Sequence, residues 1–232
     1  MGTALLVEYY AELPSSKRED APVSRRRMQA ALDKFKKQVG ARYQEGTLQR
    51  LLDSSDGTTR RAAVLALGML GSMKSNALLA YRLKDEDRTL RQLAADALWS
   101  LWYRADSEAN NQELQRVRQL SDNDKKRAAL DALIQKAPAF AEAYNQRAIL
   151  NFQMSEYQKS ISDCEKVIKL NPCHFGALVG MAQCYMGLNK PKPALRAFRN
   201  AYRINPDMEG VEETIRALES ALGEEGRRNE ER

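Results

Sequence analysis

The chain has 232 residues, 43% of them hydrophobic and 29% charged, a composition typical of a globular protein in water. No apolar run approaches the roughly 18 residues that a membrane-spanning helix needs, and the short apolar patch near residue 5 cannot form a signal-peptide core. Its three cysteines cannot all pair with one another, which favours the cytoplasm or another reducing compartment.

The N-terminal segment, residues 1–42, carries the positive charge of the chain. Between Lys17 and Arg42, nine Lys or Arg residues stand against three acids, which accounts for the whole formal charge of +6. Apolar residues at 3-4 spacing predict one helix over residues 24–39, with Ser24 as its N-cap and Gly40 as its stop. The basic patch of this helix consists of Arg25, Arg26, Arg27, Lys34, Lys36 and Lys37.

A basic helix with an apolar stripe is compatible with three roles. It can cap the end of a repeat array, bind an acidic protein, or bind RNA or an anionic membrane. Aromatic side chains for base stacking are almost absent, since Phe35 lies on the apolar stripe. We favour capping, and salt dependence distinguishes phosphate binding because that binding weakens steeply with ionic strength.

Residues 43–106 contain two similar phrases 31 residues apart, at positions 59–70 and 90–101. Asp56 and Asp87 precede them at the same offset, and each follows a leucine-rich segment. An aspartate, then arginine, then an alanine-rich and leucine-rich helix resembles the second helix of a HEAT repeat. Both aspartates are expected near a helix start, where a carboxylate accepts hydrogen bonds from unpaired backbone N–H groups.

The HEAT resemblance implies a role for several polar residues, because second helices line the concave side of such arrays. It places Arg60, Arg61, Arg91 and Gln92 at or near that side. These residues could contact an acidic partner or be the solvated ends of otherwise apolar helices. We favour solvated ends slightly.

From residue 107 a longer period takes over. Pro172 and Pro206 close the similar phrases KLNP and RINP, and Pro138 precedes Pro172 at the same spacing. A period of about 34 residues that ends in proline resembles the tetratricopeptide (TPR) repeat, a helix-turn-helix unit. The resemblance is poor in the leading helix of residues 107–138, where Leu114 takes the place of a small residue, as expected of a repeat at a junction.

Small residues recur at the positions where the two helices of a TPR unit approach each other. They are Ala148 and Ala182 in the first helices, and Ser160 and Ala194 at the start of the second helices. Cys164 occupies the next packing position, which favours a core residue over a nucleophile.

The end of the chain predicts a helix that caps the last repeat. Residues 209–222 place Val211, Ile215, Leu218 and Leu222 on one stripe, and an open repeat array needs such a cover for its apolar end. The repeats and this helix are expected to fill residues 107–223, and residues 224–232 to form a charged flexible tail.

The TPR resemblance implies a concave groove lined by first helices. Amide side chains there can hydrogen-bond an extended peptide, and apolar side chains can form pockets for it. Some of these residues could instead pack on the neighbouring unit. The expected groove residues are Asn111, Gln115, Arg118, Glu142, Asn145, Gln146, Ile149, Phe152, Val179, Gln183 and Met186.

A chain-terminal carboxylate is not the expected ligand of this groove. TPR co-chaperones that hold the C-terminus of heat-shock chaperones use a clamp of Lys, Asn and Arg side chains. The corresponding positions here are Asn111, Gln115, Gln146, Gly176 and Gly180, so the clamp's cations are missing.

Catalytic and metal-binding motifs are not evident in the sequence. The single histidine, His174, falls in a turn between repeats, and Cys173 beside it invites a zinc hypothesis. The cysteine spacings lack the close pair of structural zinc sites, and no phosphate-binding glycine loop or nucleophile motif occurs. We therefore expect no metal, no cofactor and no enzymatic activity.

Taken together, the patterns predict an all-α protein, a right-handed α-solenoid of HEAT-like repeats followed by TPR repeats and a capping helix. The expected function is that of a scaffold or adaptor that binds a peptide or a partner subunit, for example during the assembly of a complex. The alternative is that the basic N-terminal helix associates with RNA or an anionic membrane.

Overall fold

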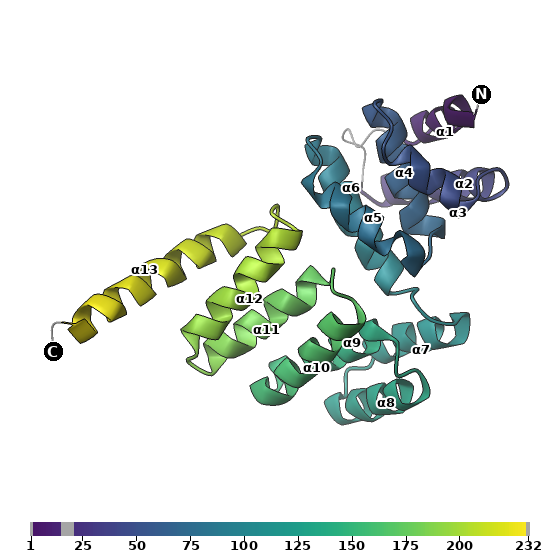
Figure 1. Ribbon diagram of the computed structural model, residues 1–232. Helices are drawn as coiled ribbons and strands as arrows, with labels where there is room; N and C mark the ends of the chain where they lie inside the picture. Colours follow the sequence, from purple (N-terminus) through teal and green to yellow (C-terminus); the bar gives the residue numbers. More distant parts are fainter. Residues whose placement is uncertain (1, 15–20, 231–232) are drawn as a thin grey trace. The chain divides into compact units, whose positions relative to one another are not determined.

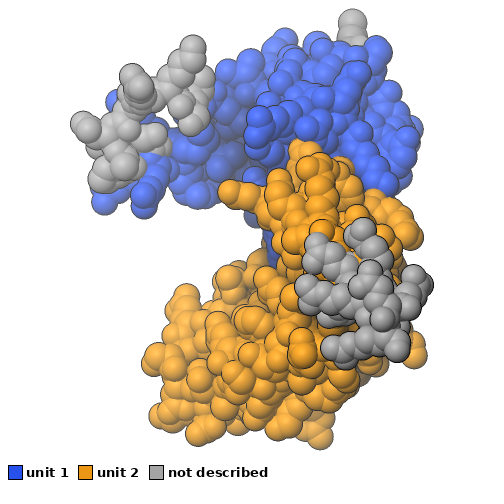
Figure 2. All heavy atoms as spheres, turned by 90° about the vertical axis from the view of Figure 1, so that its left-hand side faces the viewer, with its two compact units in different colours: residues 1–101 blue, residues 102–232 orange. Residues whose placement is uncertain are grey.

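A computed structural model describes residues 2–14 and 21–230, with side-chain surroundings given for residues 3–14 and 25–223. All regular structure in those residues is helical, which confirms the predicted all-α class. The chain divides into two compact units, unit 1 over Met1–Leu101 and unit 2 over Trp102–Arg232 (Figure 2). Within the described residues, no helix is long and apolar enough to span a membrane.

Unit 1 contains six α-helices and two short 3₁₀ turns among its described residues (Figure 1). They are α1 (Gly2–Ala11), α2 (Ala21–Gly40), α3 (Glu45–Leu51), α4 (Gly57–Leu70), η1 (Met73–Ser75), α5 (Asn76–Tyr81), η2 (Arg82–Lys84) and α6 (Arg88–Trp102), whose last residue begins unit 2.

The two aspartates predicted near helix starts are N-caps in the structure. The carboxylate of Asp56 accepts hydrogen bonds from the backbone N–H groups of Thr58 and Thr59, at 3.3 and 2.8 Å from the nitrogens. Asp87 does the same for Thr89 and Leu90, at 2.9 and 3.4 Å. The 31-residue period of the HEAT-like phrases is therefore also seen in the structure, as two helix starts that are capped in the same way.

The core of unit 1 is built on the alanine-rich helix α4. Small residues let neighbouring helices approach closely, and an added Cβ on Gly68 would lie only 2.8 Å from the Cβ of Ala97 on α6. The side chains of α4 that fill this core are Ala62, Ala63, Val64, Ala66 and Leu67.

Helix α2 begins at Ala21, three residues before the predicted start. Ser24 is thus inside the helix, and its prediction as the N-cap is wrong. Pro22 explains the earlier start, because proline is compatible with the first turn of a helix. The helix ends at Gly40, as predicted.

Unit 2 contains helix pairs that follow one another in chain order (Figure 1). Its helices are α7 (Glu108–Arg118), α8 (Asn123–Lys136), α9 (Ala141–Gln153), α10 (Tyr157–Leu170), α11 (Phe175–Gly187), α12 (Pro191–Ile204) and α13 (Val211–Glu230).

The pairs α9–α10 and α11–α12 repeat each other down to their turns. Ser155 and Asn189, which occupy the same position in the two turns, adopt left-handed φ angles of 59° and 54°. After each, the next backbone N–H returns to a carbonyl of the first helix, from Glu156 to Asn151 and from Lys190 to Tyr185, both at 2.8 Å. The predicted small residues are all buried, namely Ala148, Ser160, Ala182 and Ala194.

Helix α13 covers the apolar side of α12, as expected of a capping helix. Val211, Ile215 and Leu218 are buried in one cluster with Ala194 and Phe198 of α12, and the cluster also contacts the partly buried Leu222. The helix continues to Glu230, through most of the stretch expected to form a flexible tail. The side chains of that stretch, and residues 231–232, lie outside the described part of the chain.

Candidate peptide-binding surface

By the TPR pattern, equivalent positions of successive first helices are expected to form columns on one side of unit 2. Gln115, Ile149 and Gln183 follow one another at the spacing of one TPR repeat, as do Arg118, Phe152 and Met186. All six side chains are exposed. We call the surface made by these columns and the half-buried Gln146 and Val179 the first-helix face.

Apolar side chains stand out on this face. Ile149, Phe152 and Met186 expose 44%, 36% and 43% of their surface. Helices α9 and α11, which carry them, contact each other. Exposed large apolar residues that gather on one surface, rather than scatter singly, mark sites of interaction.

Three predicted groove residues are buried instead of presented to solvent. Asn111, Glu142 and Asn145 expose 6%, 0% and 4% of their surface. The amide of Asn111 bonds to the backbone of Asp106, donating to its carbonyl at 2.8 Å and accepting from its N–H at 3.2 Å. These three residues therefore lie beneath the first-helix face and support it.

Glu142 is the centre of a buried polar cluster. One carboxylate oxygen accepts hydrogen bonds from the amides of Asn145 and Gln146, at 2.9 and 2.7 Å. The other lies 3.1 Å from Nε2 of His174. A buried carboxylate is tolerated only when donors surround it in this way.

The hydrogen bonds of His174 fix its tautomer. Its Nδ1 accepts from the backbone N–H of Ala177 at 3.0 Å, and so caps helix α11. The proton of the neutral ring therefore lies on Nε2, which donates to Glu142. The imidazole is fully buried and stacks on Trp102, with 4.1 Å between ring centroids. His174 thus lies between repeats, as predicted, and joins them.

The cluster also reaches the edge of the first-helix face through Tyr103. Burial, together with the nearby charge of Glu142, raises the pKa of this phenol. Its hydroxyl accepts a hydrogen bond from Gln146 at 3.3 Å, and the guanidinium of Arg118 lies 4.2 Å above its ring. Gln146 and Arg118 are consequently held in place by contacts with Tyr103.

Two of the cysteines of unit 2, Cys164 and Cys184, are buried core residues. Cys164 is buried at its predicted packing position, and burial raises the pKa of its thiol to about 12. Cys184 is buried and its Sγ lies 3.1 Å from the hydroxyl of Ser160. Within the part of the chain that the structure describes, no group of three or more His, Cys, Asp or Glu side chains could hold a metal ion.

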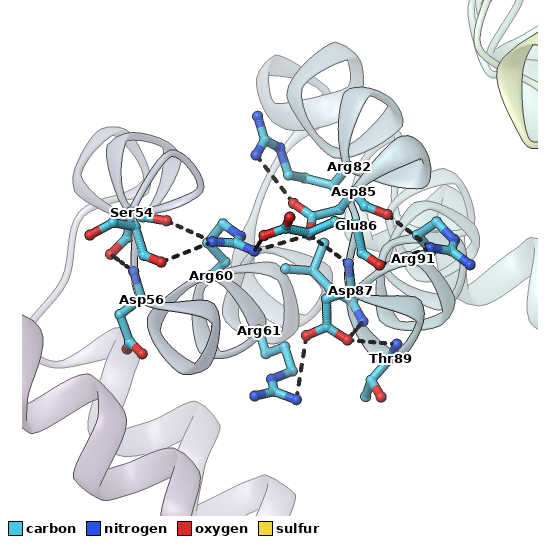
Figure 3. A network of polar contacts seen from close by, with 12 residues as sticks. Ser54, Asp56, Arg60, Arg61, Arg82, Asp85, Glu86, Asp87, Thr89 and Arg91 are labelled. Carbon is cyan, nitrogen blue, oxygen red and sulfur yellow. Dashed lines mark hydrogen bonds and ion pairs between the residues drawn. The ribbon is translucent and has the colours of Figure 1, made fainter.

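The arginines of unit 1 tie the two HEAT-like repeats together (Figure 3). Arg60 exposes only 8% of its surface and donates to the carbonyl oxygens of Ser54 and Ser55, at 3.0 and 3.3 Å. Its other terminal nitrogen reaches a carboxylate oxygen of Asp85 in the next repeat, at 3.1 Å. This ion pair and hydrogen bond raise the pKa of Arg60. The expectation of a solvated helix end is therefore wrong for Arg60.

The same contact recurs one repeat later. Arg91 donates to the carbonyl oxygens of Asp85 and Glu86, at 2.9 and 3.2 Å, just as Arg60 does to the equivalent residues of the preceding repeat. Arg61 pairs with Asp87 at 3.4 Å, again between repeats. Gln92 is exposed on α6.

Sequence reasoning missed Arg82, which also joins the repeats. It donates to the carbonyl of Leu52 at 3.2 Å and pairs with Asp53 at 2.9 Å. A cavity of about 470 Å³ lies beside it, and its charged lining consists mostly of side chains that already pair with one another. The lining residues are Asp53, Ser54, Arg60, Tyr81, Arg82, Lys84, Asp85 and Glu86.

The basic patch lies on the solvent side of α2. Its six side chains are exposed, and Lys34 pairs with Glu12 of α1 at 2.7 Å. The apolar stripe of the same helix is inside unit 1, where Phe35 and Val39 expose 1% and 0% of their surface. Helix α2 accordingly packs on α1 and α4 with one side and presents cations on the other.

Comparison with known families agrees with the two repeat types. Residues 44–134 match the model for HEAT repeats, and residues 141–172 match the model for the tetratricopeptide repeat. Both predicted resemblances are confirmed. The HEAT match extends through α7 and most of α8, the segment that the sequence suggested was a first, junction TPR unit.

Two curated proteins share part of the sequence. A TPR repeat-containing protein of Rhizobium etli is 39% identical over 93 residues, which cover 40% of this chain and 46% of that protein. Sperm-associated antigen 1 of Mus musculus is 30% identical over 82 residues, which cover 35% of this chain and 9% of that protein. The chain therefore spans less than half the length of either relative.

One solved structure, the first TPR of Spaghetti (RPAP3) bound to an HSP90 peptide, is similar with a TM-score of 0.43 and 17% identity. The match covers 50% of this chain and 89% of that chain.

Proposed function

Because residues 44–134 are HEAT repeats and residues 141–172 a TPR repeat, we propose that this chain is a non-catalytic scaffold that binds a segment of another protein. The segment lies in an extended conformation on the first-helix face. The observation that carries the proposal is the exposure of Ile149, Phe152 and Met186 on neighbouring first helices. Both repeat families serve mainly as protein-interaction modules.

The residue types of this face suit main-chain recognition. A glutamine amide both donates and accepts, so Gln115 and Gln183 can bond to the C=O and N–H groups of an extended peptide. The apolar residues between them remove side chains of the ligand from water, which supplies most of the binding free energy. Specificity then depends on the spacing of apolar residues in the ligand.

The ligand is proposed to be an internal segment rather than a chain terminus. Asn111 stands where a carboxylate clamp needs its first lysine, and Gly176 and Gly180 stand where it needs its second lysine and its arginine. Gln146 already donates to Glu142 and Tyr103. The cation of this face, Arg118, lies outside the clamp positions and already stacks on the ring of Tyr103.

Affinity capture tests the proposal with two matched variants. The first is Ile149→Ala/Phe152→Ala/Met186→Ala on the first-helix face, and the second is the control Leu78→Ala/Tyr81→Ala, which removes exposed apolar side chains of unit 1. Each variant and the unchanged chain serve as bait in extract of the source cells, with mass spectrometry of the bound proteins.

The expected result is one protein that the unchanged chain and the control capture and the first-helix variant does not. With that protein purified, the first-helix variant should bind at least about tenfold more weakly, since truncation of a central apolar contact costs about 1–2 kcal/mol or more. Equal affinities of all three baits, with unchanged circular dichroism, would show that the first-helix face is not the binding surface.

A further inference from the structure

Over residues 25–40, where side chains are described, the outward side of α2 concentrates positive charge without large apolar residues. The helix carries six basic residues and one acid, Asp33, which accepts a hydrogen bond from Gln29 at 3.0 Å. Its exposed residues with described side chains are otherwise small or amide residues. We propose that this surface binds the phosphates of double-stranded DNA, with α2 lying in the major groove.

The cations are arranged in rows along the helix. Arg25 and Lys36 are 11 residues apart, which is about three turns and about 16 Å on the same side of a helix. Arg26 and Lys37 form a second row with the same spacing, about 100° further round. Arg27 and Lys34, which are about two turns apart, form a third row on the far side of the second row.

This arrangement fits a groove better than a plane. The outer rows lie about half a circumference apart, so a flat bilayer could contact only one of them at a time. A helix about 10–12 Å wide in the major groove of B-form DNA, itself about 12 Å wide, has phosphates on both flanks. The pair of Lys34 with Glu12 is no obstacle, because both side chains are about half exposed and such pairs contribute little.

The burial of the apolar stripe argues against the other classes of partner. An interfacial membrane helix inserts its apolar face among lipids, but Phe35 and Val39 are already enclosed within unit 1. A protein interface needs a desolvated centre of aromatic or apolar side chains, and among the described side chains on the outward side of α2 Ala30 is the only apolar one. Contacts to phosphates need neither an apolar face that inserts among lipids nor an apolar interface centre.

The test measures binding of the full chain to a fluorescein-labelled 20-base-pair DNA duplex by anisotropy, from 50 to 200 mM NaCl. Four to six phosphate contacts give a slope of log K against log salt of about −4 to −5. The variant Arg25→Gln/Arg26→Gln/Lys36→Gln/Lys37→Gln should flatten that slope by about 3 to 4 and weaken binding at 50 mM at least about tenfold.

A matched variant separates this surface from net charge. Lys125→Gln/Lys190→Gln/Lys192→Gln/Arg196→Gln removes four exposed cations of unit 2 and should leave the slope and affinity nearly unchanged. An RNA duplex of the same sequence should bind more weakly, because its deep, narrow major groove does not admit a helix.

Four results would overturn the proposal. They are no DNA binding at 50 mM salt, equal losses in both quadruple variants, RNA duplex binding as tight as DNA binding, and binding to phosphatidylserine vesicles without binding to DNA. Circular dichroism of each variant verifies that the helices are intact.

Discussion

Glu142 and Arg60 are charged side chains that the fold removes from water, and each is surrounded by groups of complementary character. Glu142 receives donors from α9 and from His174, whereas Arg60 serves two carbonyls and a carboxylate from two loops. A buried charge that is paired and hydrogen-bonded holds its partners in place, and removal of one of those partners is costly. Both residues therefore define how one repeat sits on the next within its own unit.

The variant Glu142→Gln tests the buried cluster. The new amide places two donors where Asn145, Gln146 and His174 already donate, so at least one donor is left without an acceptor. The expected cost is about 1–3 kcal/mol of the free energy of unfolding. Urea unfolding followed by circular dichroism measures it, with Glu165→Gln on the exposed side of α10 as the control. Equal shifts in the two variants would contradict the account of the cluster.

At the scale of elements, the turn between the two helices of each TPR-like pair requires a left-handed residue. Ser155 and Asn189 occupy that position with φ near 60°. Glycine adopts this conformation without steric cost, asparagine does so more readily than most residues, and serine pays more. The turn geometry is thus kept by the pairs of helices around it rather than by the residue itself.

Replacing Ser155 with glycine should stabilise unit 2. Glycine relieves the strain of the left-handed φ angle but also gives the unfolded chain more conformational freedom. The net effect is expected to raise the free energy of unfolding by about 0.5–1 kcal/mol. Thermal unfolding measures the change, and Asn189→Gly in the equivalent turn should give a smaller gain. A loss of stability in Ser155→Gly, or a larger gain in Asn189→Gly, would show that φ does not limit these turns.

Most helices could be predicted from the sequence because each type of repeat contains recurring residues that mark helix ends and helix contacts. N-cap aspartates recur in the HEAT-like stretches, and small residues and closing prolines recur in the TPR-like units; both sets indicate where the helices lie. The burial of individual side chains could not be predicted in this way. Asn111, Glu142 and Asn145 occupy positions that the repeat pattern assigns to the groove, yet each is covered by residues from neighbouring segments, such as His174 over Glu142. Such covering depends on tertiary contacts that no local pattern encodes.

At the scale of the whole molecule, the chain consists of two compact units with separate cores. In repeat proteins each element contacts mainly its neighbours along the chain, so stability is a sum of local contributions. A defect in one unit should therefore remain largely local. The domain limits expected from the sequence, at residues 42, 106 and 223, stay a proposal that this locality can test.

The variant Leu67→Ala opens a cavity in the core of unit 1, where Leu67 is fully buried. The expected local cost is about 2–5 kcal/mol. Amide hydrogen exchange should show faster exchange in α4 and the helices that contact it, with α9 to α12 unchanged. Leu195→Ala in α12 should give the reverse pattern. Loss of protection in both units from either variant would show that they unfold as one.

The ties among Arg60, Asp85 and Arg91 bear on how such a chain can change length. The second HEAT-like stretch brings the arginine Arg91, the loop carbonyls that it binds and the acid Asp85 for Arg60 of the first stretch. Duplication of that complete stretch would supply each added arginine with its carbonyls and the preceding arginine with an acid. Loss of the loop around Asp85 alone would leave the guanidinium of Arg60 buried without its carboxylate. Insertion of the whole second stretch is therefore expected to cost less stability than insertion or loss of part of it.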